Sequence, residues 1–274
     1  MVLIIAEAGE NHCGDMDMAH ELIEVAARAR ADYVKFQLYD ASKVAESDPE
    51  KEWFQKVQLS DEQFFDLVAY ARKQGIQPLG TPWDVEKAEL IFRAGIPDMK
   101  VASFHVVDLE LLRFVNGRAR RVFLSTGMSS IEEIETAVDA LEQVPELYVL
   151  HCVSEYPLPP ERVNLRVMGA LKQRFGRQAK IGYSDHTISI IAAVAAVANG
   201  AEVIEKHITL DKTLPGTDHI FSADPDELVE LVKQIRMVET LLGSSEKHLT
   251  PTEAENQIFM RTRFRHGRPI PIGE

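Results

Sequence analysis

The stretch Leu3-Ile-Ile-Ala-Glu-Ala-Gly-Glu-Asn-His-Cys-Gly14 decides the fold class. Its first six residues form a short apolar run, which is typical of a strand buried on both faces of a parallel sheet. The loop behind this run matches neither the G-x-G-x-x-G pattern nor a phosphate loop that ends in Gly-Lys-Ser/Thr. This disfavours a doubly wound nucleotide-binding sheet, which stays the alternative to a parallel barrel.

Short apolar runs alternate with amphipathic segments along nearly the whole chain. Gly75, Gly95, Gly117, Gly176 and Gly200 each follow a helical pattern and precede an apolar run, where a left-handed C-cap residue belongs. Eight such units over about 240 residues predict a (β/α)8 TIM barrel. The expected strands are residues 3–8, 33–38, 76–80, 99–103, 122–125, 147–151, 180–182 and 202–207.

We expect the barrel to occupy residues 1–243 as a single catalytic domain. Residues 244–274 are polar, carry four arginines among 261–268, and are expected to form a linker or C-terminal arm. Capping-box patterns predict helix starts at 60–63, 130–133 and 224–227, and the apolar segment 188–199 predicts a helix buried on most sides. The long connections 39–59 and 208–224 are expected to be lids or binding elements, or else decorative insertions.

The composition excludes several classes of protein. The 274 residues hold 30 Lys+Arg and 43 Asp+Glu, a formal net charge of −13, which disfavours nucleic acid or an anionic membrane as a partner. Cys13 and Cys152 cannot build a disulfide framework, which indicates a reducing compartment. The chain opens on no signal-peptide pattern, and its longest apolar run is about half a membrane span. We therefore expect an acidic cytoplasmic protein.

Polar residues end nearly every predicted strand. In a parallel barrel these ends meet at one rim, where the chemistry of such folds takes place. Lys35, Lys100 and Lys206 interrupt apolar strands, and an unpaired lysine is costly to bury, so they indicate an anionic ligand at that rim. Serine hydroxyls at the same ends suit phosphate or carboxylate oxygens. The alternative is internal salt bridges, such as Lys35 with Glu7 or Lys206 with Glu205.

Two histidines, His186 and His207, end the seventh and eighth predicted strands. Adjacent strands could bring both imidazoles to one divalent ion, with Mn²⁺, Mg²⁺ or another first-row metal favoured by the oxygen-rich surroundings. The alternative is a pair of hydrogen-bonded core histidines. Cys152 could be a third ligand, but a small buried core residue is the better interpretation. Burial of Glu7 should raise its pKa toward a value useful for acid–base catalysis.

The polar strand ends together resemble the sialic acid synthase family, which contains N-acetylneuraminate, legionaminate and pseudaminate synthases. The resemblance extends over residues 3–240. The segments that carry it are Ala6-Glu-Ala-Gly-Glu-Asn-His-Cys-Gly14, Lys35-Phe-Gln37, Gly80-Thr-Pro-Trp-Asp84, Lys100-Val-Ala-Ser103, Ser125-Thr-Gly-Met128, Leu150-His-Cys-Val-Ser-Glu-Tyr-Pro157, Gly182-Tyr-Ser-Asp-His-Thr187, Glu205-Lys-His207 and Gly216-Thr-Asp218.

The resemblance implies a TIM-barrel transferase that uses a divalent metal. It would condense phosphoenolpyruvate with an N-acyl amino sugar, such as N-acetylmannosamine, and release a 2-keto-3-deoxy nonulosonic acid and phosphate. By motif, His186 and His207 match metal ligands, while Glu7, Lys35, Gln37 and Tyr156 match residues around the reacting centre. Glu7, Gln37, Tyr156 and Asp218 match the sugar site. The phosphoenolpyruvate site is matched by Lys35, Lys100, Ser103, Ser125, Ser154 and Ser184.

Members of the family typically continue into a small antifreeze-like domain, which supplies an arginine to the sugar site of a partner subunit. This sequence ends at Glu274, where that domain would begin, so a longer protein and a stand-alone barrel both stay open, as does a homodimer. Two rival functions also stay open. One is a metal-dependent isomerase or a Schiff-base aldolase that uses Lys100 or Lys206; the other is a non-catalytic barrel that binds a sugar.

Overall fold

The computed structural model describes residues 1–262. These residues form two compact units, of which the first is Met1–Thr240 and the second begins at Leu241. Three of the four arginines predicted to cluster in the tail, Arg263, Arg265 and Arg268, lie outside the described residues. The site lies entirely in the first unit.

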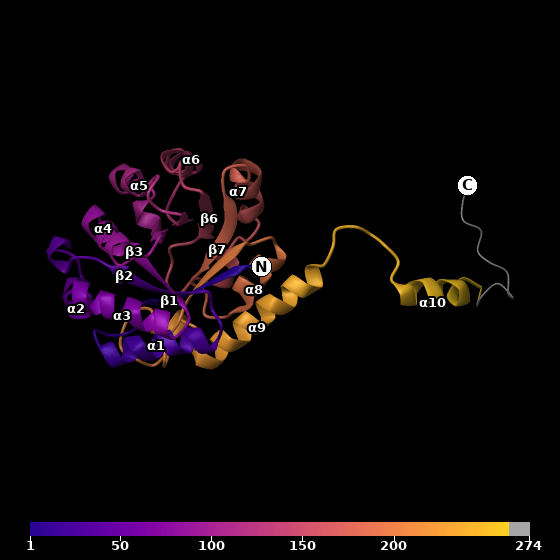
Figure 1. Ribbon diagram of the computed structural model, residues 1–274, viewed down its shortest axis with the longest axis horizontal. Coiled ribbons are helices and arrows are strands. Elements are labelled where there is room, and N and C mark those ends of the chain that lie inside the picture. The colour runs from indigo at the N-terminus through magenta and orange to yellow at the C-terminus, as the bar shows by residue number, and fades with distance from the viewer. Residues whose placement is uncertain (263–274) are drawn as a thin grey trace. The chain divides into compact units, whose positions relative to one another are not determined.

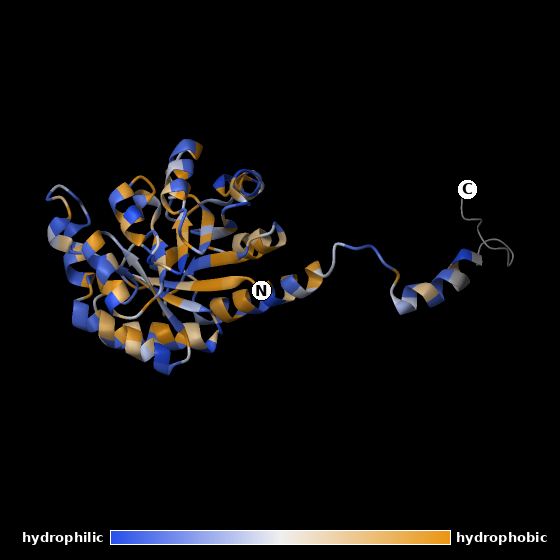
Figure 2. Cartoon of the chain, turned by 45° about the horizontal axis from the view of Figure 1, so that its top comes forward, coloured by the Kyte–Doolittle hydropathy of each residue, from blue (hydrophilic) through white to orange (hydrophobic). Residues whose placement is uncertain are grey.

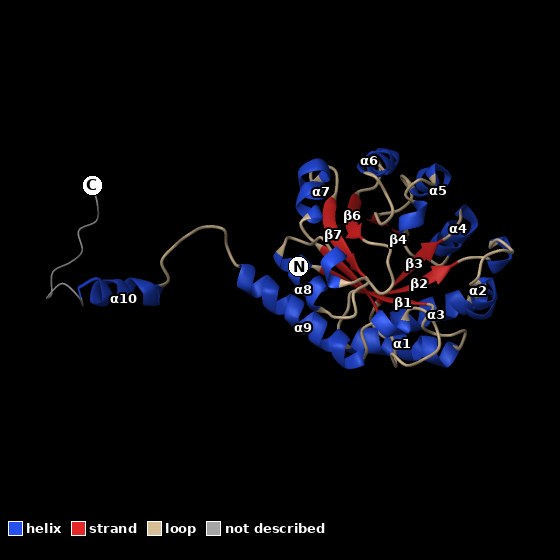
Figure 3. Ribbon diagram, turned by 180° about the vertical axis from the view of Figure 1, so that it is seen from behind, coloured by secondary structure: helices blue, strands red, loops and turns tan. Residues whose placement is uncertain are grey.

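Eight parallel strands form the centre of the first unit (Figure 3). Their order in the sheet is β3-β2-β1-β8-β7-β6-β5-β4, and β3 and β4, at the two ends of this order, lie side by side and nearly close the barrel. The predicted barrel is therefore confirmed and the doubly wound sheet is wrong. The strands are β1 (Leu3–Gly9), β2 (Tyr33–Leu38), β3 (Gln77–Pro82), β4 (Asp98–Val101), β5 (Arg121–Ser125), β6 (Glu146–Cys152), β7 (Lys180–Asp185) and β8 (Val203–His207).

Helices surround the strands as an outer ring (Figure 1). The long connection after β2 contains the short helix α2, and the connection after β8 contains a 3-10 turn at His219–Phe221. The helices of the first unit are α1 (Met16–Arg28), α2 (Lys51–Val57), α3 (Asp61–Lys73), α4 (Val85–Arg93), α5 (Leu109–Val115), α6 (Ile131–Ala140), α7 (Val167–Phe175), α8 (Ile191–Ala198) and α9 (Pro225–Leu242).

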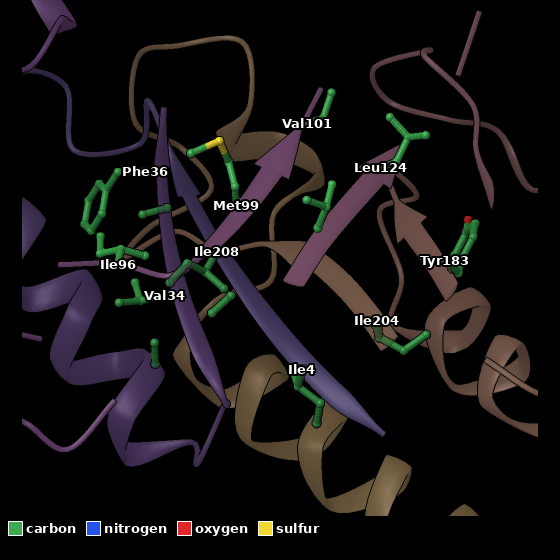
Figure 4. Packing of buried hydrophobic residues seen from close by; sticks show 14 of the residues in the cluster. Ile4, Val34, Phe36, Ile96, Met99, Val101, Leu124, Tyr183, Ile204 and Ile208 are labelled. Carbon is green, nitrogen blue, oxygen red and sulfur yellow. The ribbon is translucent and has the colours of Figure 1, made fainter. Parts of the chain in front are cut away.

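Alternation along each strand divides the apolar side chains into two layers, because successive residues of a strand face opposite sides. Ile4, Val34 and Ile204 belong to the large cluster between the strands and the helices (Figure 4). Ile5 and Val203, one residue away, belong to a separate cluster that fills the barrel interior together with Tyr33, Leu79, Phe123, Tyr148 and Leu150. In Figure 2 orange stretches run along several strands, while the helices carry both orange and blue residues, as expected of helices that pack on the barrel through one apolar face.

The predicted helix starts are confirmed. Ser60 and Gln63, and likewise Ser130 and Glu133, form reciprocal capping boxes. Asp224 and Glu227 exchange the equivalent hydrogen bonds, at 2.9 and 3.2 Å. Four of the five C-cap glycines have positive φ, between 71° and 93°. Gly176 is the exception: its φ is −64°, and a Cβ there would lie 2.4 Å from the Lys172 carbonyl oxygen, so close approach requires this glycine.

One expectation for a helix needs correction. The segment 188–199 is not buried on most sides, since Ile188 and Ile191 are exposed and α8 packs through Ala193, Ala196 and Val197. The second unit contains the helix α10 (Pro251–Thr262), and the interpretation of residues 244–274 as a linker or C-terminal arm stays a prediction. Within residues 1–262, no helix combines the length and the apolar character needed to cross a membrane.

Candidate active site

A cavity of about 480 Å³ opens at the carboxyl ends of the strands. Each of the eight strands, or the residues directly after it, contributes at least one side chain to its wall. The structure brings together in this wall every site residue that the family resemblance implies: Glu7, Lys35, Gln37, Lys100, Ser103, Ser125, Ser154, Tyr156, Ser184, His186, His207 and Asp218.

A buried network of carboxylates and lysines forms the floor of the cavity. The Lys35 Nζ lies 2.9 Å from Glu205 Oε2 and 3.3 Å from Glu7 Oε2, and the Lys100 Nζ lies 3.7 Å from Glu205 Oε1. All four side chains are at most 5% exposed. The network is compact enough for each charge to respond to its neighbours.

The pKa values of this network follow from burial and from the charges around each group. Burial raises the pKa of Glu7 to about 7, against the opposing effect of Lys35, in the direction that the sequence predicts. Burial lowers the pKa of Lys100 to about 8. Burial also works against the charge of Glu205, but Lys100 and Lys35 outweigh it and hold the pKa of that carboxyl well below its usual range. Glu205 therefore stays ionised, and both lysines form ion pairs with it.

Serine hydroxyls and one glycine surround the basic end of the cavity. The Gly127 N–H donates to Ser103 Oγ at 3.0 Å, and a Cβ at Gly127 would lie 2.3 Å from Ser154 Oγ. The buried hydroxyls of Ser125 and Ser154 have no hydrogen-bond partner among the described residues. Ser184 differs, because its hydroxyl donates to Glu205 at 2.9 Å. Two unsatisfied hydroxyls beside two buried lysines form a region suited to an anion.

The imidazoles of His186 and His207 lie close together, with ring centroids 5.5 Å apart and planes at 62°. His186 Nδ1 is 2.8 Å from the Val153 carbonyl, to which it donates, so in the neutral ring the other nitrogen is the one that carries the lone pair. His207 Nδ1 is buried without a hydrogen-bond partner in residues 1–262, and Asp218 Oδ2 lies 3.4 Å from it. Within the same residues, no group of three or more His, Cys, Asp or Glu side chains is arranged to hold a metal ion.

The remaining predicted residues surround this pair. Gln37 donates to Glu7 Oε1 at 3.1 Å. The ring of Tyr156 lies 4.2 Å from the ring of His186, and the side chain is 51% exposed, so its outer face borders the opening. Cys152 is a free thiol whose sulfur is 4.0 Å from His186 Nδ1, and it lines the cavity rather than the apolar core.

The two long connections both reach the cavity. Glu50 and Phe54 come from residues 39–59, and Thr217 and Asp218 come from residues 208–224. Phe54 packs on Trp83 with ring centroids 5.3 Å apart, and both aromatic side chains line the cavity. Both segments are therefore parts of the cavity, and the interpretation as decorative insertions is wrong.

Lys206 does not join the other two lysines. Its side chain is fully buried on the opposite face of β8, where its Nζ lies 3.1 Å from Asp185 Oδ2 and donates to the Thr187 carbonyl. The reason is the two-residue period of a strand: Glu205 and His207 face the barrel interior, so Lys206 between them faces the helices. Of the two internal salt bridges considered as the alternative, that of Lys35 with Glu7 is present at 3.3 Å, whereas Lys206 pairs with Asp185 in place of Glu205.

Several wall residues were missed by the sequence analysis as site residues. Glu205 shares a face with His207, and this alternation was the signal that could have found it. Thr81 ends β3 with a buried hydroxyl that has no partner among the described residues. Glu10 is held by Tyr39 and Trp53, which come from a different segment, so no local pattern indicates it.

The fold and the cavity define a class: a parallel barrel whose rim carries an anion region beside a pair of imidazoles. Residues 22–247 match the NeuB family. N,N'-diacetyllegionaminic acid synthase of Campylobacter jejuni is 37% identical over 99% of this chain and 86% of its own length. An uncharacterized protein of Methanocaldococcus jannaschii is 43% identical over 99% of this chain and 81% of its own.

A solved structure agrees with these sequence relationships. The N-acetylneuraminic acid (sialic acid) synthetase of Leptospira borgpetersenii superimposes with a TM-score of 0.89 at 36% identity, over 96% of this chain and 92% of that chain. The protein belongs to the NeuB family, as its resemblance to the sialic acid synthases predicts.

Proposed function

We propose that the protein condenses phosphoenolpyruvate with an N-acyl amino sugar to give a 2-keto-3-deoxy nonulosonic acid and phosphate. The observation that carries this proposal is the pairing, in one cavity, of an anion region built from two buried lysines and unsatisfied hydroxyls with two neighbouring imidazoles. The names of its relatives support the same class of reaction.

Phosphoenolpyruvate would bind at the basic end. Lys35 and Lys100 supply positive charge, and Ser103, Ser125 and Ser154 supply hydroxyl groups for phosphate and carboxylate oxygens. The Ser184 hydroxyl, which donates to Glu205, would act chiefly by orienting that carboxylate between the lysines. The substrate is thereby held with its C3 free to react.

The donor set at His186 and His207 fits a divalent ion. His186 is oriented by the Val153 carbonyl, and His207 has a buried ring nitrogen without a partner among the described residues. Burial lowers the pKa of His207 well below its usual value, so this imidazole is neutral, as a ligand must be. When bound, Mn²⁺ or Mg²⁺ would act as a Lewis acid on the carbonyl oxygen of the open-chain sugar.

The proposed reaction joins the two substrates through C3 of phosphoenolpyruvate. The electrons of its C2=C3 double bond form the new bond to the aldehyde carbon of the sugar, and the aldehyde oxygen takes up a proton and becomes a hydroxyl. Water adds to C2 and loses its protons, the C2–O bond to phosphate breaks, and C2 becomes the keto carbon. Glu7, with a pKa of about 7, would hold and transfer the proton that these steps require, and Gln37 would keep its carboxyl oriented. Tyr156 and Asp218 would contact the sugar at the opening.

The rival functions predict different chemistry. A Schiff-base aldolase needs an accessible lysine with a lowered pKa. Of the two candidates, Lys100 and Lys206, Lys100 is the one that lines the cavity, and burial lowers its pKa to about 8. Borohydride would then trap a covalent adduct with a keto substrate. We also propose a reducing, cytoplasmic location, since Cys13 and Cys152 are both free thiols.

The experiment is a phosphate-release assay with phosphoenolpyruvate and a panel of N-acyl amino sugars, with and without EDTA. We expect release that requires both substrates, is abolished by EDTA, and returns with Mn²⁺ or Mg²⁺. The variant His207→Ala should lose this activity, and Lys100→Met should lose affinity for phosphoenolpyruvate. Release without a sugar, or full activity in EDTA and in His207→Ala, would contradict the proposal.

A further inference from the structure

The charge of the cavity is unevenly distributed. Among the described residues that line it, two are lysines, Lys35 and Lys100, whereas five carry carboxylates. Both lysines lie within 3.7 Å of Glu205, and Lys35 also contacts Glu7. The cationic groups are therefore gathered at one end, where the proposed phosphoenolpyruvate site already requires them.

The other three carboxylates, on Glu10, Glu50 and Asp218, lack such compensation. In residues 1–262 no lysine or arginine forms an ion pair with any of them, and the nearest basic group to Asp218 is the neutral imidazole of His207, whose Nδ1 lies 3.4 Å from Asp218 Oδ2. Glu10 is influenced by the negative charges of both Glu50 and Asp218. A second phosphate group in this cavity would find these carboxylates and no free cation among the described side chains.

Glu10 is fixed in place as a hydrogen-bond acceptor. It is 8% exposed, the Tyr39 hydroxyl donates to its Oε1 at 2.9 Å, and the Trp53 indole N–H donates to its Oε2 at 2.8 Å. A carboxylate has about four acceptor positions, so two stay free after these contacts. Because Glu10 lines the cavity, these positions are open to a donor group of a bound molecule.

We propose that the acceptor sugar carries no phosphate, and that Glu10 is a specificity-determining residue that accepts a hydrogen bond from an N–H or O–H group of this sugar. The inference rests on the proposed function and names the substrate class of the same site. Like charges placed together across an interface disfavour the wrong partner, and here Glu10, Glu50 and Asp218 oppose a sugar phosphate. Burial raises the pKa of Glu10 to about 7, as expected of a carboxyl without a cationic partner.

The test compares three acceptors in the phosphate-release assay: N-acetylmannosamine, its 6-phosphate, and 2,4-diacetamido-2,4,6-trideoxymannose. For the wild-type chain we expect the better of the two unphosphorylated sugars to exceed the 6-phosphate by about 100-fold in kcat/KM. Equal or better use of the 6-phosphate would overturn the inference. Absence of release with all three sugars would instead refute the proposed function, and the inference with it.

Three variants test the role of Glu10. Glu10→Gln should raise the KM for the unphosphorylated sugar and lower the kcat/KM ratio of this sugar to the 6-phosphate about tenfold. The KM for phosphoenolpyruvate should stay within about twofold of the wild-type value. Glu50→Gln, at an exposed position of the same wall, should also reduce the preference for the unphosphorylated sugar over the 6-phosphate. It replaces Glu10→Gln as the test if that variant folds poorly. Glu52→Gln, an exposed position of α2 outside the cavity, is the matched control. If both cavity variants discriminate like Glu52→Gln, Glu10 has no such role.

Discussion

Glu7 combines almost complete burial, which raises its pKa, with two partners, Lys35 and Gln37, that both lower it. It is 1% exposed, its Oε2 faces Lys35 at 3.3 Å, and its Oε1 accepts from Gln37 at 3.1 Å. Its desolvation outweighs the attraction of Lys35, so the pKa rises to about 7. A carboxyl that changes its charge near neutral pH inside a cavity is suited to transfer protons.

The substitution Glu7→Gln keeps the shape of the side chain and removes its proton transfer. We expect kcat to fall about 100-fold or more, because positioned general acid–base groups contribute on that scale. The KM for phosphoenolpyruvate should change little, since the lysines and serines that hold this substrate are unchanged. Steady-state kinetics with both substrates varied give the two constants. A kcat within a factor of two of wild type would remove Glu7 from the chemistry.

The raised pKa of Glu10 predicts that the stability of the folded protein depends on pH. Its folded-state pKa of about 7 lies above the usual value of 4.5, so between these pH values the folded protein binds a proton that the unfolded chain releases. Its contribution to stability is therefore present below about pH 4.5 and is lost as the pH rises toward 7. Glu10→Gln removes this loss, so the variant should gain about 1–3 kcal/mol relative to wild type between pH 5 and pH 8.

Urea unfolding of wild type and Glu10→Gln at the two pH values measures this difference. The informative quantity is the change, from one pH to the other, in the difference between the unfolding free energies of the variant and of wild type. The difference at a single pH is less informative, because the amide also alters the hydrogen bonds to Tyr39 and Trp53. Glu52→Gln should show no such change. A difference between the two proteins that is constant with pH would mean that Glu10 titrates normally.

Successive side chains of strand β8 lie on opposite faces of the strand and therefore have different roles. Glu205 and His207 face the cavity, while Lys206 faces away and pairs with Asp185 of β7, its register partner. Both members of this pair are completely buried. Removing one member of such a pair leaves an uncompensated buried charge, which is more costly than losing the attraction alone.

Lys206→Met should therefore lower the free energy of unfolding by about 3–5 kcal/mol, because it leaves the Asp185 carboxylate without its cation. Lys180→Met, at a 45% exposed lysine that pairs with Glu146, is the control and should cost less than about 1 kcal/mol. Denaturant unfolding measures both. A loss for Lys206→Met no greater than for the control would mean that the buried pair does not stabilise the packing of β7 on β8.

The loop that follows β5 forms part of the anion region through its backbone. Gly127 donates its N–H to Ser103, and a methyl group there would lie 2.3 Å from Ser154 Oγ. Gly127→Ala should displace Ser154 and raise the KM for phosphoenolpyruvate about tenfold, with a smaller effect on the KM for the sugar. Kinetics with each substrate varied in turn separate the two constants. An equal rise in both would place Gly127 outside the phosphoenolpyruvate site.

The sequence predicts the strands closely, because a strand buried on both faces must be a short apolar run, and eight such runs stand out. It also predicts which strand ends carry polar groups. It does not predict contacts between distant segments, such as that of Trp53 with Glu10, because these depend on how the long connection folds. A lysine in an apolar strand does not by itself indicate the cavity: the two-residue period of β8 turns Lys206 away from the cavity and toward Asp185.

At the scale of the whole molecule, the barrel brings groups of opposite chemistry into a single cavity. The lysines and serines come from β2, β4, β5 and β7 and the loops after β4 and β6, the histidines from β8 and the loop after β7, and further carboxylates from β1 and the long connections. No segment of the chain contains a complete site. The proposed reaction depends on this convergence, since it joins two different substrates.

The most direct test follows the carbon atom that is proposed to react. The protein is incubated with [3-13C]phosphoenolpyruvate, an unphosphorylated N-acyl amino sugar and Mn²⁺, and the products are examined by 13C NMR after removal of the metal. We expect the labelled vinyl carbon to become a methylene carbon that is bonded to the former aldehyde carbon of the sugar. One phosphate should be released per product. A label that stays in phosphoenolpyruvate, or moves to the methyl group of pyruvate, would contradict the account.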